Sequence, residues 1–172
     1  SVFFFGPQED FKDAKNVIAY AYQGGISLPE KAYYLEPQYQ DKRDAFVAHV
    51  ERMLVMAGTE ASDAKAQATT VLAFETRLAK ASLSPIELRD PANQYNYVSI
   101  ADADKNSPNF SWSQFFAAEG LSAVKGFSLS QPKFFAEMDK MIAETPVADW
   151  QAYLRYQTIN GAAPFLSDAA SK

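Results

Sequence analysis

Cysteine is absent from this sequence of 172 residues, and histidine occurs only once, as His49. A catalytic zinc site normally takes three protein ligands, mainly His, Cys and carboxylates, and a serine or cysteine nucleophile needs a base that is usually histidine. One histidine can act as one ligand or as one base, but it cannot act as two. The composition therefore argues against zinc hydrolysis, thiol catalysis and disulfide stabilisation by this chain alone.

Long apolar runs and an excess of positive charge are missing as well. The apolar stretch at residues 2–5 is too short for a signal-peptide core or a membrane span. Lys and Arg total 16 against 21 for Asp and Glu, so the formal net charge of -5 argues against binding to nucleic-acid phosphates. The abrupt apolar start without a methionine predicts a fragment of a longer parent protein.

The rest of the composition is that of a globular chain. Hydrophobic residues make up 48% and aromatic residues 14%, well above the disordered class, in which low apolar content prevents collapse. A chain of this length is expected to form one domain with a substantial core. We therefore expect residues 1–172 to be a single folded fragment.

His49 lies in a predicted amphipathic helix over residues 41–58. Apolar residues recur there at intervals of three and four, among them Phe46, Val50 and Leu54. His49 lies beside this apolar stripe, with Glu51 and Arg52 close in sequence. We therefore interpret it as an ordinary helix residue and not as a catalytic base.

The N-terminal region predicts a small antiparallel β-ribbon, and the rest of the chain predicts helices. Residues 17–22 alternate as a strand does, and residues 2–5 could pair with them across a polar turn. Spacing indicates a helix over residues 62–82, and capping-box patterns start at Ser84 and Ser111. Further helices are expected to begin near Ser130, Thr145 and Ala162. The predicted fold is therefore mainly α, a multi-helix domain with a small β-ribbon near the N-terminus.

The aromatic content leaves two interpretations open. The Phe, Tyr and Trp side chains could line a groove for peptides or sugars, or they could fill the core. At helical spacing, aromatic side chains belong more often to the core. A stand-alone helical module that binds peptides or sugars without catalysis is the alternative function.

The segment after the predicted ribbon has an unusual pattern. It reads Gln23-Gly24-Gly25-Ile26-Ser27-Leu28-Pro29-Glu30-Lys31-Ala32-Tyr33-Tyr34-Leu35. Two glycines release the chain from the strand, and a proline precedes paired tyrosines, which predicts a structural corner with buried aromatic side chains. The pattern also resembles the neprilysin and endothelin-converting-enzyme family of zinc metallopeptidases, where Gln-Gly-Gly-Leu leads to Leu-Pro and then to Tyr-Tyr-Leu.

Two further blocks resemble the same family in the same order, so that the resemblance covers almost the whole chain. Residues 23–35 are the first family block, and the second family block contains Glu75, Leu78, Ala79, Ser82, Arg89-Asp90-Pro91, Tyr95-Asn96, Phe110 and Trp112. The third family block contains Trp150, Tyr153, Leu154 and Arg155. The sequence departs from the family at Ile26, Ser27, Ala32 and Leu88, where Leu, Gly, Asp and a basic residue are common.

The resemblance implies which part of the family's protein this chain represents. The family takes its zinc from a His-Glu-x-x-His helix and a downstream glutamate, with the motif glutamate as general base. His49-Val50-Glu51 is not that motif. The resemblance therefore implies no catalytic, cofactor-binding or metal-binding residue in this chain, and it places the zinc and the catalytic residues beyond Lys172 in the parent.

The implied role is that of a mostly helical, non-catalytic lobe, which faces the catalytic lobe across an internal cavity and limits substrate size. The implied partners are that catalytic lobe and, in the parent, peptides hydrolysed with the help of zinc. Family members typically act outside the cytoplasm, and the lack of cysteine favours a periplasmic or exported bacterial enzyme. The motif residues are expected to be structural: Gln23, Gly24, Gly25, Leu28, Pro29, Tyr33, Tyr34, Leu35, Glu75, Arg89, Asp90, Pro91, Tyr95 and Trp112.

Glu75 interrupts the small apolar face of the predicted helix between Val71 and Leu78. An unpaired buried carboxylate is costly, so a buried Glu75 needs a partner. We hypothesise that Arg89 is that partner and that the pair holds the loop at Asp90-Pro91 against the helix. The alternative is an exposed glutamate on the helix surface.

Overall fold

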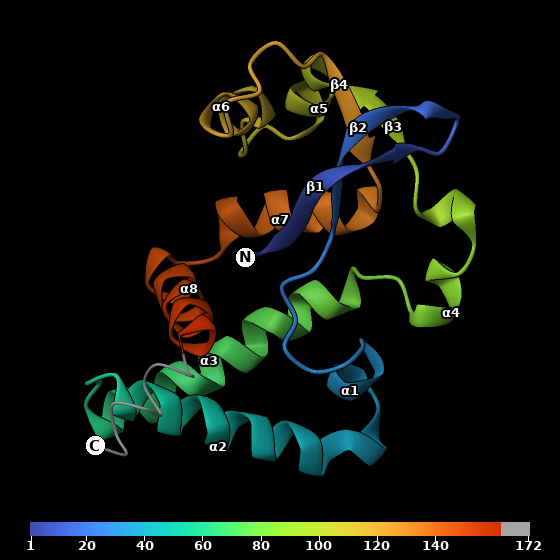
Figure 1. Ribbon diagram of the computed structural model, residues 1–172. Coiled ribbons are helices and arrows are strands. Elements are labelled where there is room, and N and C mark those ends of the chain that lie inside the picture. The colour runs from blue at the N-terminus through green and yellow to red at the C-terminus, as the bar shows by residue number, and fades with distance from the viewer. Residues whose placement is uncertain (163–172) are drawn as a thin grey trace. The chain divides into compact units, whose positions relative to one another are not determined.

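The computed structural model describes residues 1–162, and most of its elements are helices (Figure 1). In chain order they are β1 (Phe3–Asp10), β2 (Asp13–Gln23), α1 (Ala32–Leu35), the 3-10 helix η1 (Pro37–Tyr39), α2 (Gln40–Met56), α3 (Ala61–Lys80), α4 (Pro85–Leu88), the 3-10 helix η2 (Pro91–Asn93), β3 (Tyr97–Ser99), α5 (Ile100–Asn106), α6 (Trp112–Ala118), β4 (Gly126–Leu129), α7 (Pro132–Glu144) and α8 (Val147–Gly161). The prediction of a mainly α fold with a small N-terminal ribbon is confirmed.

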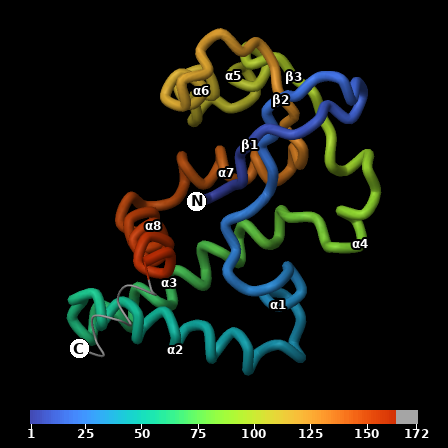
Figure 2. The backbone as a smooth tube through the Cα atoms, in the orientation of Figure 1, coloured from blue at the N-terminus to red at the C-terminus, as the bar shows by residue number. Residues whose placement is uncertain are grey.

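The chain forms two compact units, each built from segments that are far apart in the sequence. The helical unit contains Ser1, Ile26–Lys80 and residues 145–162, and the sheet unit contains Val2–Gly25 and Ala81–Glu144. The colours in Figure 2 let the reader follow the chain through these segments. The expectation that residues 1–172 form a single folded fragment stays a prediction. Two compact units can still fold together as one domain.

The sheet unit is built on a sheet with the strand order β1-β2-β4-β3. β1 and β2 form the predicted antiparallel ribbon, in which Phe5 lies opposite Ala21. β2 pairs in parallel with β4, and β4 pairs antiparallel with β3. The expectation that the whole chain after the ribbon is helical is therefore wrong for β3 and β4. Strands of 3 and 4 residues are too short to show a clear alternation.

An aromatic cluster fills the core of the sheet unit. Trp112, the first residue of α6, is inaccessible to solvent. Its ring lies 5.5 Å from that of Phe3 on β1, 4.9 Å from Phe127 on β4 and 5.5 Å from Phe135 on α7, measured between ring centroids. Aromatic pairs at such separations stabilise a core beyond the burial of their area. These aromatic residues belong to the core, as their spacing indicates.

The helical unit packs α2 and α8 against α3 (Figure 1). α3 is the predicted helix of residues 62–82, and its Ala64, Ala68 and Val71 are fully buried. Small side chains at a contact let helix axes approach closely. Farther along α3, the ring of Phe74 stacks on Tyr153 of α8 at 4.0 Å. α3 is therefore the central helix of this unit.

The predicted helix starts at Ser84 and Ser111 are confirmed by side-chain caps. Ser84 and Glu87 exchange the two hydrogen bonds of a capping box at the start of α4. The hydroxyl of Ser111 accepts a hydrogen bond from the backbone N–H of Gln114 at 3.2 Å at the start of α6. The helices expected near Ser130 and Thr145 are α7 and α8. The helix expected from Ala162 lies outside the described residues, apart from Ala162 itself, which is the C-cap of α8.

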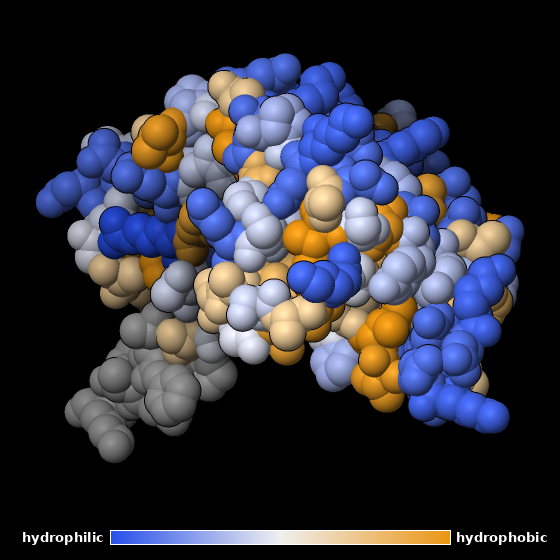
Figure 3. Space-filling view, turned by 90° about the horizontal axis from the view of Figure 1, so that it is seen from above, coloured by the Kyte–Doolittle hydropathy of each residue, from blue (hydrophilic) through white to orange (hydrophobic). Residues whose placement is uncertain are grey.

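Apolar side chains reach the surface in separate patches among polar ones on the face that Figure 3 shows. The most exposed large apolar side chains are those of Phe4, Val17, Ile86 and Val147. Scattered exposed apolar residues are normal in folded proteins, so none of them marks an interface by itself. Within residues 1–162, no helix is both long enough and apolar enough to cross a membrane.

We expect Trp112→Ala to lower the free energy of unfolding by about 3–5 kcal/mol, because it removes the ring around which the aromatic cluster packs and leaves a cavity. Ile86 is 75% exposed on α4, so Ile86→Ala should change that free energy by no more than about 0.5 kcal/mol. Urea denaturation followed by circular dichroism measures both variants. Equal losses in the two variants would contradict the central place of Trp112 in the core.

Candidate functional site

Gln23, the last residue of β2, ties three segments of the sheet unit together. Its side chain forms two hydrogen bonds with the backbone of Leu83, since Nε2 donates to the carbonyl oxygen at 3.1 Å and Oε1 accepts from the N–H at 2.8 Å. The backbone N–H of Gln23 donates to Oε1 of Gln131 at 2.7 Å. Nε2 of Gln131 in turn donates to the carbonyl oxygen of Asn93 at 2.9 Å. Gln23 thus joins the first family block to the loop of the second.

Gly24 and Gly25 let the chain leave β2. A Cβ at Gly24 would lie 3.1 Å from two carbons of the Phe4 ring, which is tighter than ordinary contact. Gly25 has a φ of 76°, in the left-handed region that favours glycine. The segment that follows Gly25 belongs to the helical unit. Close packing against Phe4 therefore explains why position 24 is a glycine, and the backbone conformation explains why position 25 is one.

The buried carboxylate of Glu75 organises the segment after the glycines. Glu75 lies on α3 and is inaccessible to solvent. Its Oε1 accepts hydrogen bonds from the Tyr34 hydroxyl at 2.6 Å and from the Ser27 N–H at 2.7 Å, and its Oε2 accepts from the Ser27 hydroxyl at 2.8 Å. We call Ser27, Tyr34 and Glu75 the Glu75 cluster. It attaches the corner between β2 and α1 to α3.

The hypothesis about Glu75 is confirmed for its burial and wrong for its partner. Arg89 is exposed at the C-cap of α4, in the sheet unit, whereas the hydrogen bonds to Glu75 come from Ser27 and Tyr34. Hydroxyl and backbone donors stabilise the carboxylate without the desolvation of a second ion. Tyr34 is a motif residue of the first family block, so the sequence contained part of this signal, whereas Ser27 is a position at which the chain departs from the family.

Burial raises the pKa of Glu75, and the hydrogen bonds from Tyr34 and Ser27 offset this only in part. Burial, and then the charge of Glu75, raise the pKa of Tyr34 well above its usual value. The same two causes raise the pKa of Tyr153 and of Tyr156 on α8. The Tyr34 hydroxyl therefore stays protonated near neutral pH and can donate a hydrogen bond to Glu75.

The other residues of the first family block form α1 and its flanks. Tyr33 stacks on Tyr39 with a distance of 4.2 Å between ring centroids. Leu28 is half-buried, whereas Pro29 and Leu35 are exposed. The structure therefore brings Tyr34 to Glu75, and the backbone N–H of Leu28 donates to the Tyr34 hydroxyl at 2.9 Å. Pro29 and Leu35 lie outside the Glu75 cluster.

Residues 89–96, which contain part of the second family block, connect α4 to β3. The side chain of Asp90 accepts a hydrogen bond from the backbone N–H of Ala92 at 3.0 Å and caps η2, whose first residue is Pro91. Burial, and then a hydrogen bond to Asp10, raise the pKa of Tyr95 to about 12. These residues therefore form a capped turn and contribute a protonated tyrosine, whereas Trp112 lies at the centre of the aromatic core.

His49 is half-buried on α2, where its ring lies edge-on to that of Tyr156 at 6.4 Å. Within residues 1–162, no three side chains among His, Asp and Glu lie where they could together hold a metal ion. The described residues therefore do not fit the zinc ion that the family resemblance implies for the parent.

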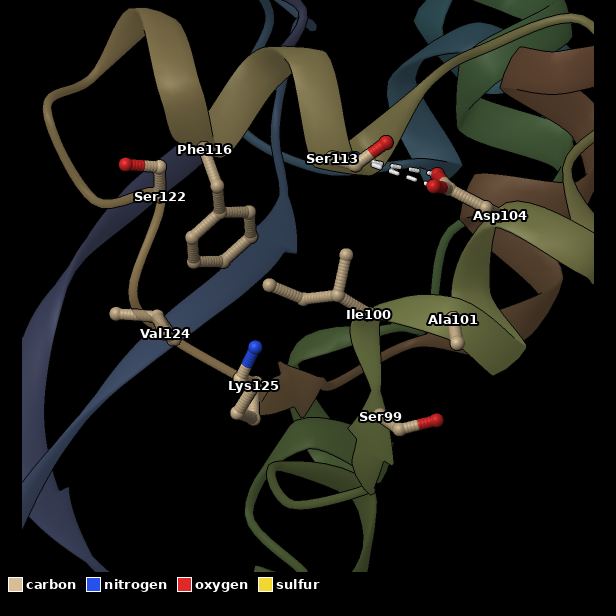
Figure 4. A pocket seen from close by; sticks show the side chains of 9 residues that line it. All are labelled: Ser99, Ile100, Ala101, Asp104, Ser113, Phe116, Ser122, Val124 and Lys125. Carbon is tan, nitrogen blue, oxygen red and sulfur yellow. Dashed lines mark hydrogen bonds between the residues drawn. The ribbon is translucent and has the colours of Figure 1, made fainter.

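One cavity in the sheet unit has a volume of about 610 Å³. Figure 4 shows the apolar side chains of Ile100, Phe116 and Val124 around it and the amine of Lys125 pointing into it. Asp104 lies at its edge, but its carboxylate accepts a hydrogen bond from the backbone N–H of Ser113 at 3.2 Å. The cavity thus combines apolar walls with one exposed lysine.

The second cavity, of about 520 Å³, lies where the loop of the second family block meets the start of α7. Its lining consists of Ala81, Leu83, Glu87, Ala92, Asn93, Tyr95, Asn96, Ser130, Gln131, Pro132 and Lys133. We call it the amide-lined cavity, because Asn93, Asn96 and Gln131 each contribute a side-chain amide. The motif pattern pointed to this loop but not to the cavity, since Ser130–Lys133 comes from a distant segment.

Comparison with known proteins decides the family. A family model described as peptidase family M13 matches residues 1–172. The chain belongs to peptidase family M13. This confirms the resemblance to neprilysin and endothelin-converting enzymes that the motif blocks indicate.

Individual relatives show how much of a whole M13 protein this chain represents. It is 27% identical to an endothelin-converting enzyme homolog of Locusta migratoria, over 94% of this chain and 24% of that protein. It is 26% identical to a neutral endopeptidase of Lactobacillus helveticus, over 96% of this chain and 26% of that protein. The open state of the zinc metalloprotease Zmp1 of Mycobacterium tuberculosis matches with a TM-score of 0.89 and 27% identity, over 96% of this chain and 26% of that one. The M13 chain thus spans about a quarter of the length of these relatives.

The Glu75 cluster predicts a large difference between two substitutions. We expect Glu75→Ala to lower the free energy of unfolding by about 2–4 kcal/mol, because it removes the acceptor of the buried Tyr34 hydroxyl and of the Ser27 hydroxyl and leaves a cavity. Glu75→Gln keeps the shape and can still pair with both hydroxyls, so its loss should stay below about 1 kcal/mol at neutral pH. Chemical denaturation measures both losses, and equal losses would contradict the cluster.

The raised pKa of Glu75 also predicts a pH dependence. Because the folded-state pKa lies above the usual value of 4.5, folding favours the protonated carboxyl. The resulting stabilisation is complete below the unfolded-state pKa and is lost as the pH rises through the folded-state pKa. We therefore expect the unfolding free energy of the natural chain, minus that of Glu75→Gln, to fall as the pH is raised from acidic to neutral. A rise of this difference over the same range would contradict the direction of the shift.

Proposed function

We propose that this M13 chain is a non-catalytic part of a zinc metalloendopeptidase that cleaves peptides. The observation that carries the proposal is the match to Zmp1, which covers 96% of this chain but only 26% of the zinc metalloprotease. In a parent of that size, about three quarters of the polypeptide remains to supply the zinc ligands and the general base. The catalytic lobe of the same polypeptide is then the main partner of this chain.

The described residues support a scaffold role. Glu75 is the most deeply buried carboxylate, and its oxygens are occupied by the donors of Ser27 and Tyr34. A general base must reach the proton that it takes, which a carboxylate enclosed in this way cannot do. In the proposed function, the chain helps to enclose the internal cavity of the parent and so limits the size of the peptides that enter.

The proposal includes a location outside the cytoplasm, in the periplasm of a bacterium or exported from it. Family membership supports the location outside the cytoplasm. The absence of cysteine supports a bacterial source over a disulfide-rich animal ectodomain.

Metal analysis of two proteins tests the proposal. We expect this chain alone to contain no stoichiometric zinc by elemental analysis and to leave a fluorogenic peptide intact. The parent, expressed from its complete reading frame, should contain zinc and cleave the peptide, lose activity with a chelator and regain it when zinc is added.

Two outcomes would overturn this assignment. Tight stoichiometric zinc in this chain would show that it holds a metal site of its own. A reading frame that lacks a His-Glu-x-x-His segment after Lys172 would instead favour the stand-alone binding module.

A further inference from the structure

The amide-lined cavity is built from firmly held polar residues. Ser130 and Gln131 line it and are only 3% and 2% exposed. Gln131 is held at both ends of its amide, by Gln23 and by Asn93. The hydroxyl of Ser130 lies 2.9 Å from that of Ser128. Polar side chains that are fixed in this way can present a defined hydrogen-bonding pattern to a ligand.

Each asparagine of the cavity uses only part of its hydrogen-bonding capacity on the fold. Nδ2 of Asn93 donates to the carbonyl oxygen of Glu87 at 2.8 Å, and Nδ2 of Asn96 donates to that of Leu129 at 3.1 Å. Within residues 1–162, neither Oδ1 atom has a hydrogen bond of its own. A primary amide has two N–H groups and one acceptor oxygen, so both asparagines keep a donor and an acceptor for a ligand.

Charge at the rim favours an acidic group on the ligand. Lys133 lines the cavity and is exposed in the first turn of α7, a helix of 13 residues. A helix N-terminus carries partial positive charge, which adds to that of the lysine. Glu87 also lines the cavity, and its carboxylate is engaged in the capping box with Ser84. The positive end of the cavity is therefore the start of α7.

We propose that the amide-lined cavity binds an extended peptide segment that carries an acidic side chain. Peptide N–H and C=O groups match the open acceptors and donors of Asn93 and Asn96, and the acidic side chain pairs with Lys133. A sugar fits less well, because the ring of Tyr95 packs against those of Phe11 and Tyr20, at 5.8 and 6.3 Å. The inference goes beyond the proposed function, because such binding needs no zinc and no hydrolysis.

Titration of the isotopically labelled chain with blocked tripeptides tests this proposal. Acetyl-Ala-Glu-Ala-amide should shift the NMR signals of Asn93, Asn96 and Gln131, with a dissociation constant of about 1 mM. Acetyl-Ala-Lys-Ala-amide should bind about fivefold more weakly, because its charge opposes that of Lys133. Maltotriose serves as the sugar probe and should leave these signals unchanged.

Two charge-reversal variants on α7 provide the matched control. Lys133→Glu should weaken binding of the Glu peptide by about fivefold and reverse the preference between the two peptides. Lys140→Glu makes the same change at an exposed residue outside the cavity lining, so it should leave both affinities unchanged. Both positions are exposed, and the dispersion of the NMR spectrum checks that each variant folds.

Several results would overturn the proposal. One is an equal loss of affinity in Lys133→Glu and Lys140→Glu, and another is a set of shifts that lies away from the cavity. Binding of maltotriose at the same signals would replace the peptide with a sugar. No shift with the Glu peptide up to about 10 mM would show that the cavity is not a peptide site.

Discussion

The carboxylate of Glu75 is removed from water, and a buried carboxylate must receive hydrogen bonds or lose its charge. The hydroxyls of Ser27 and Tyr34 and one backbone N–H meet this requirement. Both donor residues lie in the segment of the helical unit between Ile26 and the end of α1, so α3 holds this segment in place. Because these donors are neutral, no second ion has to be desolvated.

A second network of amides has the same role in the sheet unit. Gln23 holds the backbone of Leu83, and Gln131 connects Gln23 with Asn93. A primary amide both donates and accepts, so it can join segments whose free backbone groups differ in kind. The residues of the family blocks thus connect loops to regular elements in both units. The amide-lined cavity forms where this network leaves part of its hydrogen-bonding capacity unused.

A structural role for these polar networks fits a chain that spans about a quarter of the length of its M13 relatives. Among the described residues, buried polar side chains hold loops to helices and strands through hydrogen bonds, and aromatic side chains fill the cores. In the proposed function, chemistry that needs a metal belongs to the remainder of a parent protein. In the proposed peptide site, recognition rests on hydrogen bonds and on charge at the start of α7.

The sequence by itself determined the features that depend on neighbouring residues. Apolar spacing predicted α2 and α3, the caps at Ser84 and Ser111 are local hydrogen bonds, and the motif blocks predicted the family. Only the tertiary structure decided the pairing of β2 with β4, in which Tyr20 lies opposite Ser128, and the choice of Tyr34 over Arg89 as the partner of Glu75. The physical reason is that burial predicts the need for a partner, whereas the identity of that partner depends on which distant segment the folded chain brings within hydrogen-bonding distance.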